Sequence, residues 1–369
     1  MHLLAALTLF SSLSASVLGA SVCNGQAALC TRKYSTVTFI GAHNSYSVGQ
    51  NLANNQNKDI TSQLNDGIRT LQSQAHTASD GIRLCHGSCA LQDGGLLVNY
   101  LTTVTSWVKA NPNEVLTLVI VNSDNQPASR FASAFSSAGL DSYAFVPSSP
   151  QASLNDWPTL GSMIDSGKRV VVFLDNGADA SVAPYLIDEF TNMWEDPFNA
   201  VDQTFGCAVN RSQASPSSTL MLVNHYLDTT YMLAGTQLWV PARDKLNVTN
   251  AASGYGSIGA HVDNCKAIWG RNPNIILLDY YDSNSNAPFA LAAQLNGVSA
   301  PTNTVVPAST AVVSGSGASG SSKASGTAAA ANVTQSKLNG ASRVGAGGAG
   351  VWAAGALGAV GVVLGAMMI

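Results

Sequence analysis

The sequence TVTFIGAH (residues 36–43) is a short run of apolar and β-branched residues that ends at a histidine. Six runs of the same kind follow it: GIRTLQSQ (67–74), IRLCHG (82–87), VLTLVIVN (115–122), RVVVFLD (169–175), LMLVNHY (220–226) and IILLDYY (275–281). Two stretches between or after these runs have the apolar spacing of helices. They are LVNYLTTVTSWVKANPN (97–113), expected to end at Asn111-Pro112, and FALAAQLNGV (289–298), expected to end toward Gly297.

This alternation of strands and helices predicts parallel βαβ units, and seven or eight such units predict a closed barrel. The expected fold is therefore α/β, a TIM-type (β/α) barrel that forms a single domain over residues 21–300. An open doubly wound sheet is the alternative. Its nucleotide-binding form is disfavoured, because no GxGxxG or P-loop motif follows the first run.

The composition fits one large domain with tails. Of the 369 residues, 46% are apolar and 10% are charged, which predicts a sizeable core. There are 17 Lys and Arg residues against 21 Asp and Glu residues, a formal net charge of −4. Nucleic-acid binding depends on clustered basic side chains that neutralise phosphates, so this class of partner is excluded. We expect a monomer.

Both ends of the chain are interpreted as targeting segments. Residues 1–20 contain an apolar stretch followed by small residues, which predicts a secretory signal peptide. Residues 340–369 end in an apolar tail (351–369) and follow Asn339, the expected GPI-attachment residue. A membrane-spanning helix is the alternative interpretation of this tail. Residues 301–339 are rich in Ser, Thr, Ala and Gly, which predicts a flexible, O-glycosylated stalk. The mature protein is thus expected at the cell surface, anchored to the outer plasma membrane or the cell wall.

The six cysteines of an exported chain predict disulfides. The most local pairing joins Cys23 to Cys30, Cys85 to Cys89, and Cys207 to Cys265. A zinc site at CHGSC (85–89) is disfavoured, because the chain offers no second ligand pair. Sequons predict surface N-glycans at Asn210, Asn247 and Asn332.

Polar residues collect where the apolar runs end: His43, Asn44, Gln72, Gln74, His86, Asn122, Asp175, Asn224, His225 and Asp279. The active sites of (β/α) barrels are built from the carboxyl ends of strands and the loops that follow them. The sequence therefore predicts one site at this end of the barrel. Aromatic residues near these runs are interpreted mainly as core, with a headgroup pocket as the alternative: Trp194, Tyr226, Trp239, Tyr280 and Tyr281.

At GAHNSY (41–46), GIRTLQSQ, LCHG (84–87) and IILLDYY, the sequence resembles the phosphatidylinositol-specific phospholipase C superfamily. The similarity is greatest to its secreted fungal branch of PLC-like phosphodiesterases. The resemblance implies an extracellular enzyme that cleaves a phosphodiester in an inositol phospholipid or a GPI-like glycan. It also implies that His43 is the general base, His86 the general acid and Asp279 the carboxylate that orients His43. Imidazole titrates near neutral pH and can fill either role.

The second run departs from the family pattern. Calcium-dependent relatives carry carboxylates at the positions of Gln72 and Gln74, and metal-free bacterial relatives carry an arginine at the second of them. Amides can donate to phosphate oxygens but bring no charge, so we expect no cofactor and consider calcium disfavoured. The residues expected to contact the substrate are Asn44, Gln72, Gln74, Asn122 and His225. The alternative function is a barrel that has lost its chemistry and binds a glycan or lipid headgroup at the cell surface.

Overall fold

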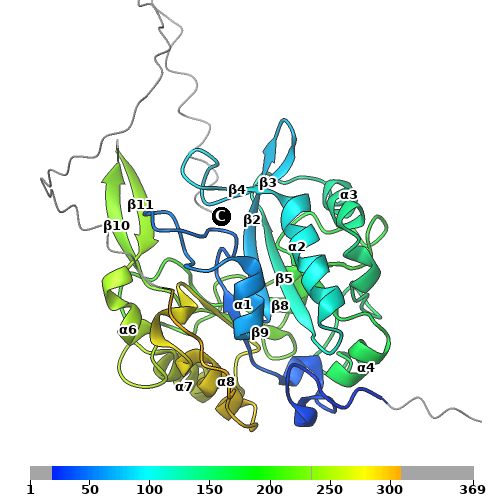
Figure 1. The fold of residues 1–369 in the computed structure, drawn as a ribbon. Coiled ribbons are helices and arrows are strands. Elements are labelled where there is room, and N and C mark those ends of the chain that lie inside the picture. The colour runs from blue at the N-terminus through cyan, green and yellow to red at the C-terminus, as the bar shows by residue number, and fades with distance from the viewer. Residues whose placement is uncertain (1–18, 234, 309–369) are drawn as a thin grey trace, which may run out of the picture. The chain divides into compact units, whose positions relative to one another are not determined.

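Eight parallel strands form one curved sheet (Figure 1), in the order β7, β6, β5, β2, β1, β12, β9 and β8. The computed structural model describes residues 19–233 and 235–308. The strands are β1 (Phe39–Ala42), β2 (Thr70–Ala78), β5 (Leu116–Asn122), β6 (Val170–Leu174), β7 (Leu186–Asp188), β8 (Met193–Glu195), β9 (Leu220–Asn224) and β12 (Ile275–Leu278). The predicted TIM-type (β/α) barrel class is thus confirmed. Within the described residues no ladder joins β7 to β8, so the hydrogen-bonded ring is open between these two strands.

Two features of the sheet differ from the sequence prediction. The run 82–87 does not form a barrel strand, because β3 (Gly81–Cys85) pairs antiparallel with β2 and with β4 (Asp93–Leu96). Only Ser79 and Asp80 separate β2 from β3, whereas a parallel connection needs a crossover of a dozen residues or more. The barrel strands β7 and β8 were not predicted, since each has only three residues.

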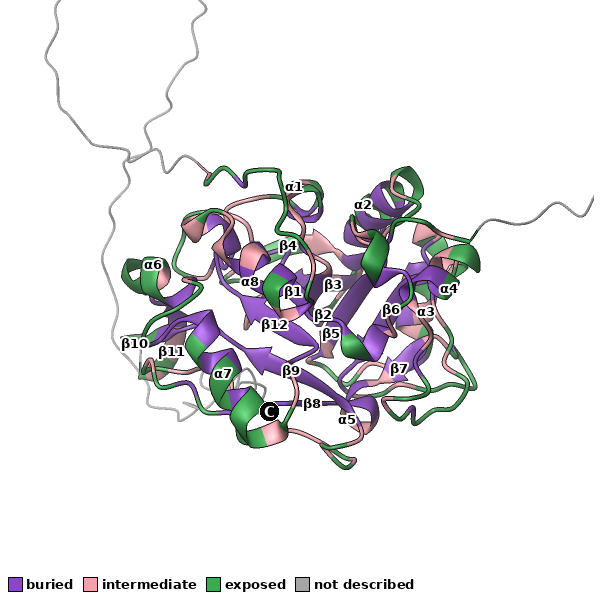
Figure 2. Ribbon diagram, turned by 90° about the horizontal axis from the view of Figure 1, so that it is seen from below, coloured by how far each residue is buried: buried purple, intermediate pink, exposed green. Residues whose placement is uncertain are grey.

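Helices cover the outside of the sheet, and Figure 2 shows their buried sides turned toward it. They are α1 (Ile60–Asp66), α2 (Leu97–Ala110), α3 (Ala128–Ala138), α4 (Leu160–Asp165), α5 (Glu189–Asn192), α6 (Leu246–Thr249), α7 (Ile258–Trp269) and α8 (Ala287–Leu295). The bounds of α2 and α8 confirm the two predicted helices. A separate hairpin consists of β10 (Asp228–Leu233) and β11 (Thr236–Pro241). Among the described residues, no helix is long and apolar enough to span a membrane.

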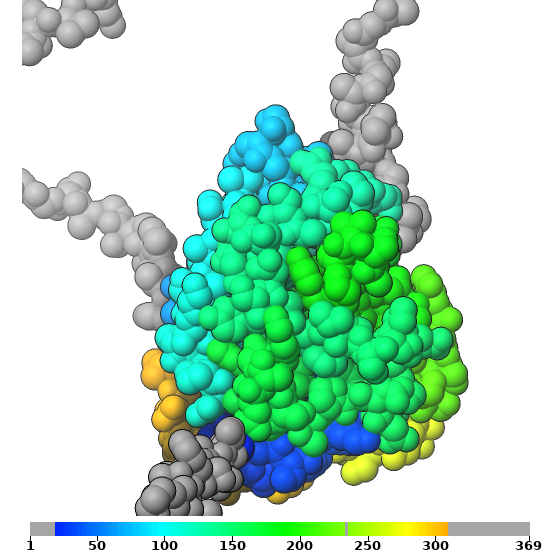
Figure 3. Space-filling model, turned by 90° about the vertical axis from the view of Figure 1, so that its right-hand side faces the viewer, coloured from blue at the N-terminus to red at the C-terminus, as the bar shows by residue number. Residues whose placement is uncertain are grey.

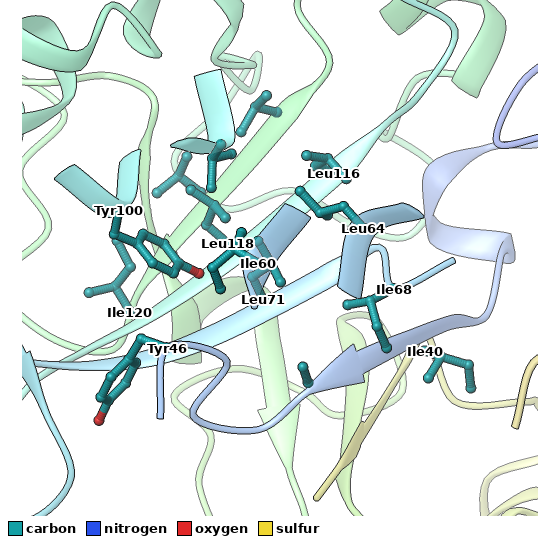
Figure 4. Packing of buried hydrophobic residues seen from close by; sticks show 14 of the residues in the cluster. Ile40, Tyr46, Ile60, Leu64, Ile68, Leu71, Tyr100, Leu116, Leu118 and Ile120 are labelled. Atoms are coloured by element: carbon teal, nitrogen blue, oxygen red, sulfur yellow. The ribbon is translucent and has the colours of Figure 1, made fainter. Parts of the chain in front are cut away.

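Alternate residues of most barrel strands belong to two different apolar clusters, whereas the inward residues of β2 are polar. Ile40, Leu71 and Leu118 pack toward the helices, in the cluster that Figure 4 shows with Leu64. Their strand neighbours, such as Phe39, pack in the second cluster, inside the barrel. Successive side chains of a strand point to opposite faces of the sheet. The alternation therefore also fixes the side to which the residues following each strand point.

The amino-terminal end of the barrel interior is filled by the beginning of the chain. Tyr34 belongs to the inner cluster together with Trp157, and its hydroxyl lies 2.7 Å from Oγ1 of Thr117 in β5. Figure 3 shows the dark blue beginning of the described chain at the lower edge of the face formed by the cyan and green residues. The opposite, carboxyl end of the strands is therefore the end left to build a site.

Three disulfides join Cys23 to Cys30, Cys85 to Cys89, and Cys207 to Cys265, which confirms the predicted pairing. The side chains of Asn210 and Asn247 are exposed, as expected for glycan acceptors. Asn332, Asn339 and residues 340–369 lie outside the described residues, as do residues 1–18 and 309–339.

We predict that Gly259→Ala destabilises the fold although it places a better helix former in α7. A Cβ at Gly259 would lie 2.0 Å from the carbonyl oxygen of Ala252, so the backbone of the preceding turn must move. The expected loss is about 1–3 kcal/mol of unfolding free energy, measured by urea titration. Gly206→Ala is the matched control, since its Cβ would meet no atom within 4 Å. Equal unfolding midpoints for the two variants would contradict the prediction.

Candidate active site

His43 and Asp279 are brought together by the pairing of two strands. β1 and β12 run parallel, with Ala42 opposite Leu278, and the two polar residues come next in each strand. The strand register directs both side chains into the mouth of the barrel. Nδ1 of His43 lies 2.9 Å from Oδ1 of Asp279, and the residues are 8% and 2% exposed.

Two asparagine amides complete the hydrogen bonding of this pair. Nδ2 of Asn55 donates to both carboxylate oxygens of Asp279, at 3.0 and 3.1 Å. Nδ2 of Asn44 lies 3.1 Å from Nε2 of His43. An amide nitrogen donates, so Nε2 is an acceptor and the proton of the neutral imidazole sits on Nδ1, toward Asp279. This is the tautomer that a base acting through Nε2 requires.

Tyr226, two residues after β9, covers one face of His43. The two rings are parallel within 1°, and their centroids lie 3.9 Å apart. An aromatic face attracts a cation, so this stack favours the imidazolium that forms when His43 takes a proton. Tyr226 therefore lies at the site, whereas the sequence predicts mainly a core role for it.

His86 follows β3 and lies across the mouth from His43. The centroids of the two imidazole rings are 6.2 Å apart, and the rings are nearly perpendicular. Nδ1 of His86 lies 2.7 Å from the carbonyl oxygen of Ala53, so Nδ1 carries the proton and Nε2 is left for a substrate. The disulfide between Cys85 and Cys89 closes the loop that holds the ring. Burial lowers the pKa of His86 below its ordinary 6.5, and the nearby His43 lowers it further, against the raising effect of the Ala53 carbonyl.

Gln72 and Gln74 each hold the backbone beside one of the histidines. Oε1 of Gln72 accepts a hydrogen bond from the backbone of Asn44 at 2.7 Å, and Oε1 of Gln74 accepts one from Gly87 at 3.2 Å. Neither amide nitrogen donates to a described residue, and neither is fully buried. Both glutamines therefore present free N–H donors near the histidines.

A salt bridge lies at the end of β8, on the part of the barrel where the ring is open. Nε of Arg211 donates to Oε2 of Glu195 at 3.1 Å, and its guanidinium packs over Phe198 at 4.8 Å from the ring centre. Asp175 follows β6 and faces the same region. Burial raises its pKa to about 6. Arg211 is a cation that sequence analysis did not place in the site, since it lies in a long loop with no periodic pattern.

Two residues predicted to contact the substrate lie outside the group around the mouth of the barrel. The side chain of Asn122 donates to the carbonyl oxygens of Gln126 (2.8 Å) and Asn176 (3.2 Å), so it holds a loop beyond β5. His225 is fully buried, and its Nε2 lies 2.8 Å from the carbonyl oxygen of Thr249. The side chains of both residues point to the outer face of the sheet, away from the barrel interior. The predicted residues that do gather around the mouth are His43, Asn44, Gln72, Gln74, His86 and Asp279.

The loop between β1 and α1 contributes site residues that were not predicted from the sequence. Ala53 contributes a backbone carbonyl, which no sequence pattern indicates, and Asn55 is one of several asparagines in the loop.

A cavity of about 460 Å³ lies elsewhere, at the amino ends of the strands, where Phe39 and Arg69 are among its lining residues. It contains none of the predicted site residues.

The fold and the site together define a (β/α) barrel protein with two facing histidines and a histidine-bound aspartate at the carboxyl ends of its strands. The family model PI-PLC X 1 matches residues 29–296, and the chain belongs to this family. This confirms the resemblance found in the sequence.

Two relatives come from the fungus Arthroderma benhamiae. The chain is 44% identical over 263 residues to a PI-PLC X domain-containing protein 1, covering 70% of this chain and 85% of the relative. It is 42% identical over 283 residues to an uncharacterized secreted protein, covering 75% of this chain but only 64% of that protein's length. Among solved structures, phosphatidylinositol-specific phospholipase C from Listeria monocytogenes is 16% identical, with a TM-score of 0.46 over 68% of this chain and 90% of that one.

Proposed function

We propose that this chain is an extracellular phosphodiesterase of the phospholipase C type, acting on an inositol phospholipid or a GPI-like glycan. The observation that carries the proposal is the arrangement of the two histidines. His43 is held by Asp279 with Nε2 as an acceptor, and His86 faces it at 6.2 Å with its own Nε2 free. Family membership supports the same class of reaction.

The chemistry follows from the protons on these rings. A substrate hydroxyl next to the phosphodiester displaces the Asn44 amide from Nε2 of His43 and gives this nitrogen its proton as its oxygen attacks phosphorus. Asp279 and the face of Tyr226 stabilise the resulting imidazolium. The bond from phosphorus to the leaving alcohol breaks, and His86, in its imidazolium form with a second proton on Nε2, donates that proton to the leaving oxygen. The products are a cyclic phosphodiester and a free alcohol.

We propose that side-chain amides hold the phosphate and that no metal is required. The free N–H groups of Gln72 and Gln74 can donate to its oxygens. Calcium does not fit this position, because it prefers carboxylates and because both glutamine oxygens already accept backbone hydrogen bonds. Coordination would break those two bonds and release the backbone beside each histidine.

The uncharged glutamines also favour the second candidate function, a barrel that binds a glycan or headgroup without cleaving it. Amides stabilise the charge that develops on a reacting phosphate less well than a guanidinium or a metal ion does. Arg211 does not restore this charge, because it is paired with Glu195. The two candidates differ in one observable, turnover.

We predict that the secreted chain converts phosphatidylinositol in mixed micelles to a cyclic phosphate, observed by phosphorus NMR, at the same rate with calcium and with a chelator. His43→Ala and His86→Ala should each lower the rate about 10²- to 10⁴-fold, because each removes one proton-transfer group. His76→Ala is the matched control, since His76 pairs with Asp124 away from the two histidines. Variant rates equal to the wild type would contradict the mechanism, and headgroup binding without turnover would favour the second candidate.

We predict an acidic pH optimum. The general acid must be protonated, and the pKa of His86 is lowered below 6.5, so its acid form disappears as the pH rises through that lowered value. Because kcat/KM reports the free enzyme, its alkaline limb should lie below pH 6.5. A kcat/KM that stays constant from pH 6 to pH 8 would exclude His86 as the acid.

We also propose that the protein is exported, glycosylated at Asn210 and Asn247, and held at the cell surface by a GPI anchor at Asn339. A relative named as a secreted protein supports export, and the sequence pattern of residues 339–369 supports the anchor. A GPI-cleaving enzyme added to intact cells should release the protein. Retention on the membrane after that treatment would favour a spanning helix instead.

A further inference from the structure

Behind the active site, on the outer side of the sheet, two histidines and an aspartate form a buried chain of contacts. Nδ1 of His225 lies 3.0 Å from Nδ1 of His261 in α7, and Nε2 of His261 lies 2.9 Å from Oδ2 of Asp196. All three residues are at most 3% exposed. The proposed reaction uses none of them.

The partners of the four ring nitrogens fix the number of protons. Nε2 of His225 contacts the carbonyl oxygen of Thr249 at 2.8 Å, and Nε2 of His261 contacts that of Gly206 at 3.0 Å. A carbonyl oxygen only accepts, so both Nε2 atoms carry protons. The contact between the two Nδ1 atoms needs a third proton, because two lone pairs would repel each other. Two neutral imidazoles hold only two protons, so one ring is an imidazolium.

The charges around the rings assign the cation to His261. Oδ2 of Asp196 lies 2.9 Å from its Nε2 and accepts no hydrogen bond, so this contact is one of charge. The rings also contact the carbonyl oxygens of Thr249 and Gly206 and the ring of Phe205, and the disulfide of Cys207 and Cys265 lies near His261. Burial and the neighbouring His261 lower the pKa of His225 to about 3, which keeps His225 neutral. Burial raises the pKa of Asp196 above its ordinary value, and the contact with His261 offsets only part of this rise. The backbone N–H of Asn224 also donates to this carboxylate at 2.7 Å, which favours its ionised form.

This cluster is joined to the active site through the segment that contains His225. Asn224 donates through Nδ2 to the carbonyl oxygen of Asp196 at 3.1 Å, on one side of His225. Tyr226, on the other side, is the residue stacked on His43. Side chains alternate along the segment, so a contact that fixes His225 on the outside also fixes the direction of Tyr226 on the inside.

We propose that Asp196, His261 and His225 form a buried triad with three protons on its four ring nitrogens, and that this triad positions Tyr226 against the face of His43. The positioning role of the triad rests on the proposed phosphodiesterase activity, whereas the number of protons on its ring nitrogens does not. A metal is not the alternative occupant. Cys207 and Cys265 also lie near Asp196 and His261, but they are joined in a disulfide and offer no thiolate.

The proton count is tested directly by nitrogen-15 NMR of the wild-type chain at pH 7. We expect both ring nitrogens of His261 to be protonated and only Nε2 of His225. A His261 with a single protonated nitrogen would overturn the triad. This measurement requires neither a variant nor a substrate, so it decides the proton count even if the chain shows no turnover.

Asp196→Asn tests the positioning role. Without the carboxylate charge the contact between Asp196 and His261 is weakened, and the His43 ring protons should lose the ring-current shift that Tyr226 imposes. The rate of phosphodiester cleavage should fall about 10- to 100-fold. A loss of this size is expected when reacting groups are displaced by up to about 1 Å. Asp124→Asn is the control, since it breaks a histidine–aspartate contact that belongs neither to the triad nor to the two facing histidines, at His76. A folded Asp196→Asn variant with an unchanged His43 shift would overturn the positioning role, whatever its activity.

Discussion

The parallel pairing of β1 with β12 is the constraint on which the site depends. It joins residues separated by more than 230 positions in the chain and places the first polar residue after each strand on the same side of the sheet. The hydrogen bond between His43 and Asp279 then costs little further conformational entropy, because the pairing of β1 with β12 already fixes both backbones. Residues such as Tyr34 fill the barrel interior from the amino ends of the strands. Polar side chains can therefore meet water and substrate only at the carboxyl ends of the strands.

A second constraint is the loop between β1 and α1, which reaches both sides of the mouth. Asn55 donates to Asp279, and Ala53, two residues earlier, accepts from His86. One loop therefore orients both histidines, so that a displacement of its backbone would alter the base and the acid together. Buried polar groups cost free energy unless they are paired, and here nearly every one around His43 has a partner. This explains why so many asparagines and glutamines occur in a site that has few charges.

The parts of this arrangement that follow from periodicity were predictable from the sequence. The apolar runs gave six of the eight barrel strands, and the histidines and Asp279 stood at their ends. The alternation that set Gln72 and Gln74 on one face would also have shown that Asn122 and His225 point outward, because Val121 and Asn224 occupy the inward phase. The contributions of Ala53 and Asn55 could not be predicted, since they depend on the path of an irregular loop. β7 and β8 are too short to produce a pattern.

The central claim is that Asp279 fixes His43 as a base that acts through Nε2. The most direct test is the tautomer of His43, observed by nitrogen-15 NMR at a pH where the ring is neutral, in the wild type and in Asp279→Asn. We expect a proton on Nδ1 and a lone pair on Nε2 in the wild type, with a mixture of tautomers in the variant. A wild-type ring with its proton on Nε2 would contradict the account, because that nitrogen could then not accept a proton from substrate.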